Sequence, residues 1–272
     1  MANRLLFTLT TGRTGTGFLY ITLDKILGSS GACYHERIGP RDFGVHTPDL
    51  SHTLQFNHFG NNEHVQQFWR RKFAGLGAGD ARYLVEASHL LAKAGLIENL
   101  PLSNDDQAIT ILKIIRNPLE TAISFAQRLS YANQAGTWLF GLHPKYPLNV
   151  VPSDPYLQFG SFGVHLWNVH EMRARSALYW HHLEQRRRDV QKLSLDITEL
   201  TTIDGVQKVL SLLGWDGRVK SLPEKVNANA KAAGSDLTKI GLDNAIKSQL
   251  PVFDIDRFIE LGSKHAYWRA FV

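Results

Sequence analysis

Cysteine is nearly absent from this chain, and so is any long apolar segment. The single cysteine, Cys33, excludes an internal disulfide framework and a cysteine-rich zinc site. No stretch approaches the run of about 20 apolar residues that a membrane-spanning helix requires. The N-terminal residues turn polar and glycine-rich after a few apolar positions, unlike a secretory signal peptide. These absences predict a cytoplasmic globular protein.

Charge of one sign is not concentrated in any segment. The 30 Lys and Arg exceed the 25 Asp and Glu and give a net charge of +5, which favours an anionic partner. The densest basic run, residues 186–188, follows a helix-like stretch and is typical of a solvated helix end. Neither interleaved aromatic residues nor a known binding motif accompanies this run, so we expect no nucleic-acid partner. A small polyanion suits the net charge equally well.

The 12 histidines show no spacing that is typical of a metal site. His181 and His182 are adjacent, and on a helix two adjacent side chains point about 100° apart, so this pair cannot share a face. The H-E-x-x-H pattern of zinc hydrolases is also missing. The sequence therefore predicts no catalytic metal.

Apolar strands alternate with amphipathic helices along most of the chain. We expect strands at residues 5–10, 32–34, 82–86, 109–115 and 192–196, and helices at 18–27, 63–73, 119–132, 166–184 and 205–213. This alternation predicts an α/β fold with a mostly parallel central sheet flanked by helices. No clear linker divides the chain, which favours a single domain over residues 1–272. Residues 136–163, rich in Gly, Pro and aromatic residues, form a predicted substrate lid.

A glycine-rich loop, Thr11-Gly12-Arg13-Thr14-Gly15-Thr16-Gly17, connects the first strand to the first helix. Its glycines let the backbone turn tightly and approach a ligand, while the helix N-terminus directs unpaired N–H groups at an anion. The threonines add hydroxyl donors, and Arg13 adds a permanent cation. This pattern predicts an anion-binding loop, with a plain strand-to-helix turn as the alternative.

Neither of the two familiar nucleotide-binding motifs matches this loop. The P-loop of nucleoside triphosphatases needs a Lys-Ser/Thr pair after its last glycine, whereas Phe18 follows Gly17 here. The glycines are also not spaced as G-x-G-x-x-G, which excludes the usual dinucleotide loop.

A second anion-binding motif follows the strand at 109–115. That strand ends in Arg116, where a magnesium-dependent P-loop enzyme commonly has an aspartate that helps hold the metal. An arginine repels a metal ion and attracts a phosphate. Ser124 follows eight residues later, in the first part of the next helix, where its hydroxyl can meet the same phosphate. The chain therefore predicts two phosphate sites, with a cation in place of the metal.

In this order, the two motifs resemble those of the sulfotransferase superfamily, which uses 3′-phosphoadenosine 5′-phosphosulfate (PAPS). Residues 11–18 are similar to the 5′-phosphosulfate loop of the family, and residues 116–124, with Pro118 two after the arginine, to its 3′-phosphate motif. The segment 192–200 and the helix that follows it give a softer match. The resemblance implies a P-loop-type fold and transfer of a sulfuryl group from PAPS to a hydroxyl or amine acceptor, with 3′-phosphoadenosine 5′-phosphate (PAP) as the product. Arginine at position 13 resembles the tyrosylprotein-type and bacterial-type members more than the cytosolic ones.

The resemblance also implies roles for individual residues. It assigns cofactor binding to Gly12, Arg13, Thr14, Gly15, Thr16, Gly17, Phe18, Arg116 and Ser124. Glu36 stands at a distance from Arg13 similar to that of the general base in the arginine-bearing group, and its neighbour His35 is the alternative base. Arg13 is expected to stabilise charge in the transition state. Residues 86–89 lack the lysine and proline that many relatives carry there, so no role is transferred to them.

Two other functions remain open at this point. One is an ATP- and magnesium-dependent phosphotransferase with an atypical P-loop, which Phe18 and Arg116 both disfavour. The other is a non-catalytic relative that binds the 3′,5′-bisphosphate. A small molecule, a glycan and a peptide are all open as the acceptor.

Overall fold

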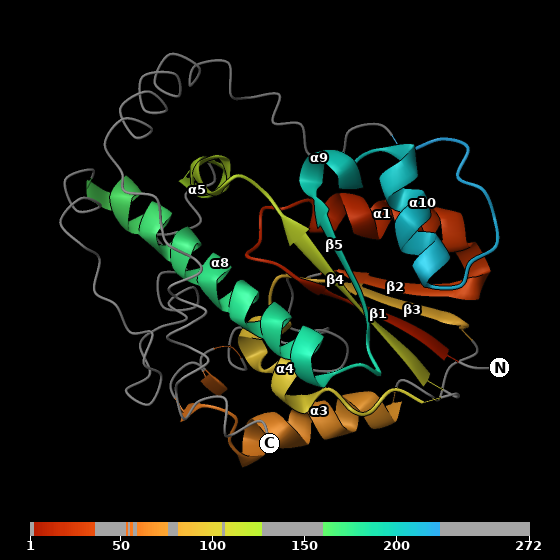
Figure 1. Cartoon of the computed structure of the whole chain (residues 1–272), viewed down its shortest axis with the longest axis horizontal. Helices are drawn as coiled ribbons and strands as arrows, with labels where there is room; N and C mark the ends of the chain where they lie inside the picture. The colour runs from red at the N-terminus through yellow and green to blue at the C-terminus, as the bar shows by residue number, and fades with distance from the viewer. Residues whose placement is uncertain are drawn as a thin grey trace.

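A five-stranded sheet forms the centre of the molecule, with helices on both of its faces (Figure 1). The computed structural model describes residues 3–35, 53, 55–56, 59–75, 81–104, 107–126 and 160–223. The strands are β1 (Asn3–Leu9), β2 (Gly31–His35), β3 (Tyr83–Ala87), β4 (Gln107–Ile115) and β5 (Gln191–Asp196). The α-helices are α1 (Thr16–Leu27), α3 (Glu63–Gly75), α4 (Leu96–Asn99), α5 (Pro118–Ala126), α8 (Gly160–Arg186), α9 (Ile197–Leu200) and α10 (Ile203–Leu212). Two short 3₁₀ helices are η1 (Gly28–Ser30) and η2 (Ala92–Ala94).

The strands pair in the order β2-β3-β1-β4-β5, and each of the four pairings is parallel. The predicted α/β class, with a parallel sheet flanked by helices, is thereby confirmed. All five predicted strands are present, with ends that differ from the prediction by at most two residues. β4 is the longest strand because its β-branched and apolar residues suit a central position that is covered on both faces.

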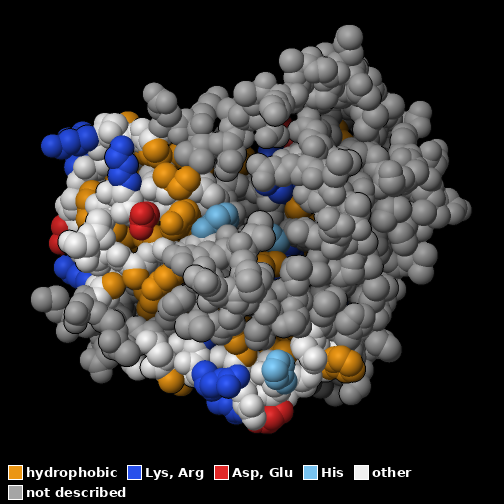
Figure 2. All heavy atoms as spheres, turned by 180° about the vertical axis from the view of Figure 1, so that it is seen from behind, with side chains coloured by type: hydrophobic (Ala, Val, Ile, Leu, Met, Phe, Trp, Pro, Cys, Tyr) orange, Lys and Arg blue, Asp and Glu red, His pale blue; other side chains and the backbone are white. Residues whose placement is uncertain are grey.

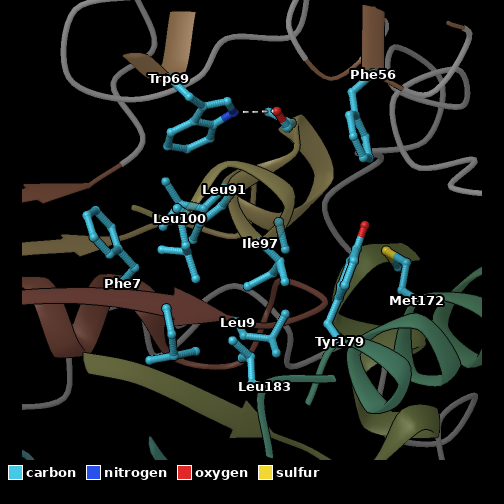
Figure 3. Close-up of a cluster of buried hydrophobic side chains, with 14 of the residues drawn as sticks. Phe7, Leu9, Phe56, Trp69, Leu91, Ile97, Leu100, Met172, Tyr179 and Leu183 are labelled. Carbon is cyan, nitrogen blue, oxygen red and sulfur yellow. Dashed lines mark hydrogen bonds between the residues drawn. The ribbon is translucent and has the colours of Figure 1, made fainter. Parts of the chain in front are cut away.

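Successive residues of a strand point to opposite faces, so the central strands contribute to two separate cores. Leu5, Phe7 and Leu9 of β1 pack with α3, α4, α5 and α8, whereas Leu6 packs with α1 and α10 on the other face. Figure 3 shows the first core, in which the buried indole of Trp69 donates a hydrogen bond of 2.7 Å to the carbonyl oxygen of Ala94. That bond ties α3 to the η2 segment.

Helix ends follow ordinary capping chemistry. Gly28, with φ of 51°, ends α1 as expected. Asn117 begins α5, where its Oδ1 accepts a hydrogen bond of 2.9 Å from the N–H of Leu119, and Pro118 occupies the first helical position. Asp196 caps α9 through a hydrogen bond of 2.9 Å from the N–H of Thr198. β5 ends at its cap, and β4 ends two residues before Asn117, so both strands pass into a helix within a short turn.

Two predicted segments are only partly covered by the described residues. Helix α8 begins at Gly160, so residues 160–163 of the predicted lid are helical, and residues 136–159 lie outside the described residues. The structure describes the predicted helix at 119–132 as far as Ala126. The short helices at 92–99 were not predicted. None of the helices in the described ranges has both the length and the apolar character needed to cross a bilayer.

The connections around β1 diverge at the carboxyl end of this strand. The chain leaves β1 into α1, which packs on one face of the sheet, whereas the segments after β3 and β4 run to the opposite face. In open parallel sheets, ligands bind where neighbouring connections diverge in this way. The fold therefore directs attention to the loop after β1 and to its neighbours.

Candidate active site

The loop after β1 holds its backbone in a shape that few sequences allow. Gly12, Arg13 and Gly15 all have positive φ, at 98°, 55° and 90°. A Cβ atom added at Gly15 would lie 3.4 Å from Cδ1 of Ile197, so α9 packs closely against this turn. Arg13 is the one non-glycine residue with positive φ in the described part of the chain, a conformation that costs roughly 1–2 kcal/mol. Such strain persists only where surrounding contacts hold it.

Hydroxyl groups brace the loop from within. The side chains of Thr10 and Thr14 are buried and hydrogen-bond each other, and the hydroxyl of Thr11 donates to the carbonyl oxygen of Gly12 at 3.2 Å. The hydroxyl of Thr14, expected as a ligand, is thus engaged in the loop itself. Thr16 is also buried, at the first position of α1.

The N-terminus of α1 faces the carboxyl edge of the sheet. Gly15 is its N-cap and supplies no side-chain hydrogen bond, while its carbonyl accepts the first helical bond, of 3.0 Å, from the N–H of Leu19. The N–H groups of Thr16, Gly17 and Phe18 belong to the first turn, which has no partner within the helix. Together with the helix dipole, these N–H groups form an anion-binding end.

The structure brings the two predicted phosphate motifs into direct contact. Nε of Arg13 donates a hydrogen bond of 3.1 Å to Oγ of Ser124, and a terminal nitrogen of Arg116 donates one of 2.8 Å to the backbone carbonyl of Arg13. Arg116 also pairs with the carboxylate of Glu120 at 3.3 Å, although the Glu120 side chain is 54% exposed and therefore well screened. These bonds bring two arginines of the two motifs to one place, which favours binding of anions.

Lys93, in the η2 segment, supports the same loop. It is 1% exposed, and its ammonium donates hydrogen bonds of 2.9 Å to the carbonyl oxygen of Thr11 and to Nδ1 of His89. No expectation from the sequence included Lys93. The available signal was a lysine within the otherwise apolar run 90–96, where a buried cation needs a specific acceptor.

His35 ends β2 at the same edge of the sheet. Its Nδ1 lies 2.5 Å from the carbonyl oxygen of Ala87, and its ring stacks on Tyr20 with a centroid distance of 5.8 Å. Because a carbonyl only accepts, Nδ1 carries the proton, which leaves Nε2 of the neutral ring as a proton acceptor. Since β3 separates β2 from β1, His35 lies about 10 Å across the sheet from β1, two strand spacings away.

A second histidine, His89, also lies near this edge of the sheet. Glu36 lies outside the described residues. His89 accepts the Lys93 ammonium at Nδ1, so its neutral ring carries the proton on Nε2, the opposite of His35. Of the two described histidines at this edge, His35 has the tautomer that suits a general base.

Glu86, in the segment to which no role was transferred, is part of the core. Its carboxylate is fully buried and pairs with the ammonium of Lys72 at 2.6 Å. This pair connects β3 to α3. The buried pair is a structural element of the fold.

A pocket opens beside the two phosphate motifs, between the carboxyl end of β4 and helix α8. Its volume is about 300 Å³. It is lined by Thr11, Lys113, Ile114, Ile115, Arg116, Arg173, Ser176, Ala177, Trp180, His181 and Glu184. The pocket therefore touches both motifs through Thr11 and Arg116 and extends from them along α8.

Lys113 and Arg173 bring two further cations to this pocket. Burial lowers the pKa of Lys113, and the nearby Arg173 charge lowers it further, although Glu184 opposes the shift. Burial likewise lowers the pKa of Arg173, which Asp196 partly offsets. Neither cation was among the expected site residues, because no local motif marks them.

Elsewhere, basic residues are dispersed or have structural roles. On the face in Figure 2, the described Lys and Arg side chains form separate small groups with hydrophobic side chains between them. Within the basic run at 186–188, Arg187 departs from the expected solvated helix end. It donates to the carbonyl oxygens of Leu100 at 3.1 Å and of Pro101 at 2.6 Å, and it pairs with Asp189. Among the described residues, no three His, Cys, Asp or Glu side chains gather as metal ligands would.

Comparisons with known proteins give one structural similarity. No protein-family model matches the chain, and no curated protein matches its sequence. A sulfotransferase from Alicyclobacillus acidocaldarius resembles it in structure with a TM-score of 0.46 and 16% sequence identity, over 99% of both chains. A likeness at this level carries no functional argument, so the function is argued below from the residues themselves.

Proposed function

We propose that this chain is a PAPS-dependent sulfotransferase that acts on a hydroxyl or amine acceptor. The contact between the two phosphate motifs carries this proposal: Arg13 bonds Ser124 at 3.1 Å, and Arg116 bonds the Arg13 carbonyl at 2.8 Å. PAPS has two separate anionic groups, a 5′-phosphosulfate and a 3′-phosphate. The joined motifs offer a cationic element to each group.

The residues present suit this cofactor better than ATP with magnesium. The first-turn N–H groups of α1 and Arg13 would hold the 5′-phosphosulfate, and Arg116 with Ser124 would hold the 3′-phosphate. Arg116 directly follows β4, where a magnesium-dependent enzyme needs a carboxylate, and a cation there disfavours a bound metal ion. A 3′-phosphate, which ATP lacks, gives this arginine a function.

The reaction requires in-line displacement at sulfur, for which PAPS supplies the activated sulfuryl group. The acceptor oxygen forms a bond to sulfur while the bond from sulfur to the 5′-phosphate oxygen breaks, and PAP leaves. Arg13 and the N–H groups of residues 16–18 stabilise the negative charge that develops on the leaving phosphate. Lys93 fixes the loop that presents these donors through its bond to Thr11. The side chains thus contribute mainly positioning and electrostatic stabilisation.

A base must accept the proton of the acceptor. Glu36 and His35 are the two candidates, and they are consecutive in the chain. The hydrogen bond from Nδ1 of His35 to Ala87 supports the second candidate, because it directs the ring and leaves Nε2 able to accept a proton. Both lie at or directly after the end of β2.

Titration calorimetry with PAP in EDTA, beside ATP with magnesium, tests the cofactor class. We expect metal-free PAP to bind, and Arg116→Ala to weaken its binding by about 100-fold, since removing one partner of a buried charge pair costs 2–5 kcal/mol. Arg188→Ala, an exposed arginine in the turn after α8, is the matched control and should bind PAP as the wild type does. Preference for ATP with magnesium, or binding of neither, overturns the proposal.

Turnover separates an enzyme from a non-catalytic PAP-binding protein. His35→Asn preserves a donor for the Ala87 carbonyl and removes Nε2, while Glu36→Gln removes a carboxylate and preserves its shape. We expect at least one of the two substitutions to lower kcat by about 10²–10⁴ with PAP affinity unchanged. A loss in one variant alone identifies the base, and unchanged kcat in both contradicts both assignments. PAP binding with no transfer from PAPS to any hydroxyl or amine tested would instead support the non-catalytic alternative.

A further inference from the structure

The pocket between β4 and α8 extends well beyond the two phosphate motifs. Only Thr11 and Arg116 of its lining belong to those motifs, whereas most of the remaining wall comes from α8. Its volume of about 300 Å³ is at the lower end of the range for small-molecule sites. The pocket is therefore adjacent to the proposed sulfuryl-transfer site and has room for a molecule of about one ring.

Cations gather at this pocket, although Glu184 and Asp196 partly offset the charges of Lys113 and Arg173. Lys113 and Arg173 are half-buried. Burial lowers the pKa of Lys113, the Glu184 carboxylate opposes this shift, and the nearby Arg173 charge adds a smaller lowering. Glu184 is exposed and is the one acidic residue in the described lining, while Arg116 adds a third cation. Holding like charges together away from water costs free energy, which an oxyanion placed between them offsets.

An aromatic surface lies beside these cations. The ammonium of Lys113 is 5.4 Å from the ring centroid of Trp180, a half-buried indole on α8 that also lines the pocket. Lys113 lies on the strand face that also carries Ile109 and Ile111, both of which are fully buried. The indole and the two cations together suit a ring that carries an acidic group.

We propose that this pocket binds an oxyanionic group, a carboxylate or a sulfate, of the sulfuryl acceptor, and that the acceptors are single-ring hydroxyl compounds with an acidic substituent. That the bound molecule is the acceptor rests on the proposed function, whereas the anion site is argued from the residues of the pocket. Lys113 and Arg173 are specificity-determining residues, because they select the charged substituent. Trp180 provides a surface against which the ring packs.

Matched pairs of probes test the inference by calorimetry in EDTA, with and without saturating PAP. The pairs are 4-hydroxyphenylacetate with 4-hydroxyphenethyl alcohol, and methyl glucuronide with methyl glucoside, with inorganic sulfate as a separate probe. We expect the charged member of at least one pair to bind about tenfold or more tightly than its neutral partner, and more tightly than sulfate. Lys113→Met and Arg173→Gln should each abolish this preference, and Lys113→Arg should restore most of it. Arg188→Gln is the control cation outside the pocket.

Each outcome bears on a different claim. Equal binding of charged and neutral members in both pairs overturns the inference and leaves the proposed function intact. Sulfate binding as tightly as the organic anions overturns it also, because the site then serves a free oxyanion. If Lys113→Met and Arg173→Gln weaken PAP by the same factor as the charged probe, the pocket belongs to the cofactor site and the inference is wrong. If PAP fails to bind the wild type while the charged preference persists, the proposed function fails and the anion pocket stands. The wild-type comparison needs no variant, and thermal unfolding verifies that each variant is folded.

Discussion

Lys93 and Thr11 are 82 residues apart in the sequence, and the Lys93 ammonium lies 2.9 Å from the Thr11 carbonyl oxygen. Thr11 opens the anion-binding loop, whereas Lys93 belongs to the η2 segment after β3. The buried ammonium also contacts Nδ1 of His89, so it connects the loop to the neighbouring crossover. The shape of the loop thus depends on a residue outside both phosphate motifs.

Lys93 supports the loop through the Thr11 carbonyl, so its replacement should weaken anion binding by changing the shape of the loop. We expect Lys93→Met to raise the Kd for PAP about tenfold, because a hydrogen bond from a charged donor contributes about 1.5–3 kcal/mol and part of it maintains the loop. Calorimetry with PAP measures the change. Lys25→Met, on the exposed side of α1, is the control and should leave Kd unaltered. An unaltered Kd in Lys93→Met would show that the loop maintains its shape without this support.

Backbone strain at Arg13 can be separated from the chemistry of its side chain. Arg13→Gly and Arg13→Ala both lose the hydrogen bond to Ser124, but only the alanine variant retains a Cβ atom at positive φ. We expect the glycine variant to be more stable than the alanine variant by roughly 1 kcal/mol in urea unfolding. Both should lose PAP affinity to a similar extent. Equal stability of the two variants would mean that the loop relaxes out of the left-handed conformation.

Removing one partner of the buried Lys72–Glu86 pair should destabilise the fold far more than replacing both partners. Glu86→Gln leaves the Lys72 ammonium in the core without its counter-charge, so we expect a loss of about 3–5 kcal/mol in the free energy of unfolding. The double variant Lys72→Met with Glu86→Leu should recover most of it. Lys208→Ala breaks an exposed pair with Glu199 and should cost less than about 1 kcal/mol. If Glu86→Gln costs as little as Lys208→Ala, water reaches the buried pair.

His182 predicts a dependence of stability on pH. Burial, with the charges of Arg186 and Arg187, lowers the pKa of His182 from 6.5 to about 4 in the folded chain. The unfolded chain therefore binds the proton first as the pH falls. Stability is unaffected by this group above a pH of about 6.5 and declines by about 3 kcal/mol in total as the pH falls to about 4.

Thermal unfolding between pH 7 and pH 4 measures this decline. His182→Leu should flatten the curve over that interval, while His181→Gln, at a more exposed neighbour, should leave its slope close to that of the wild type. Identical slopes for His182→Leu and the wild type would contradict the lowered pKa.

Sheet and helices were predictable because their signals are local. The β-branched residues of β4 and the helical spacing of α1 are each visible within about ten residues, and the structure confirms both elements. Spacing also marked Arg13, Arg116 and Ser124 as members of two motifs. Their contact was not visible in either motif, because it depends on the sheet order that places β4 beside β1.

Lys93, Lys113 and Arg173 escaped prediction for a common physical reason. The local sequence around a lysine or arginine does not show whether its side chain is solvated or buried. Its role is defined by acceptors and neighbours far away in the chain, such as the Thr11 carbonyl for Lys93 and the indole of Trp180 for Lys113. Burial of charge is a tertiary property, and no periodicity reports it.

The bond from Arg116 to position 13 is made to a peptide carbonyl, which every amino acid supplies. Substitutions at position 13 can therefore alter the cation that meets the anion without releasing Arg116. The reverse does not hold, since a shorter side chain at position 116 loses both its own anion contact and the bond that joins the motifs. A substitution at position 116 should therefore separate the two motifs, whereas one at position 13 leaves the acceptor of Arg116 in place.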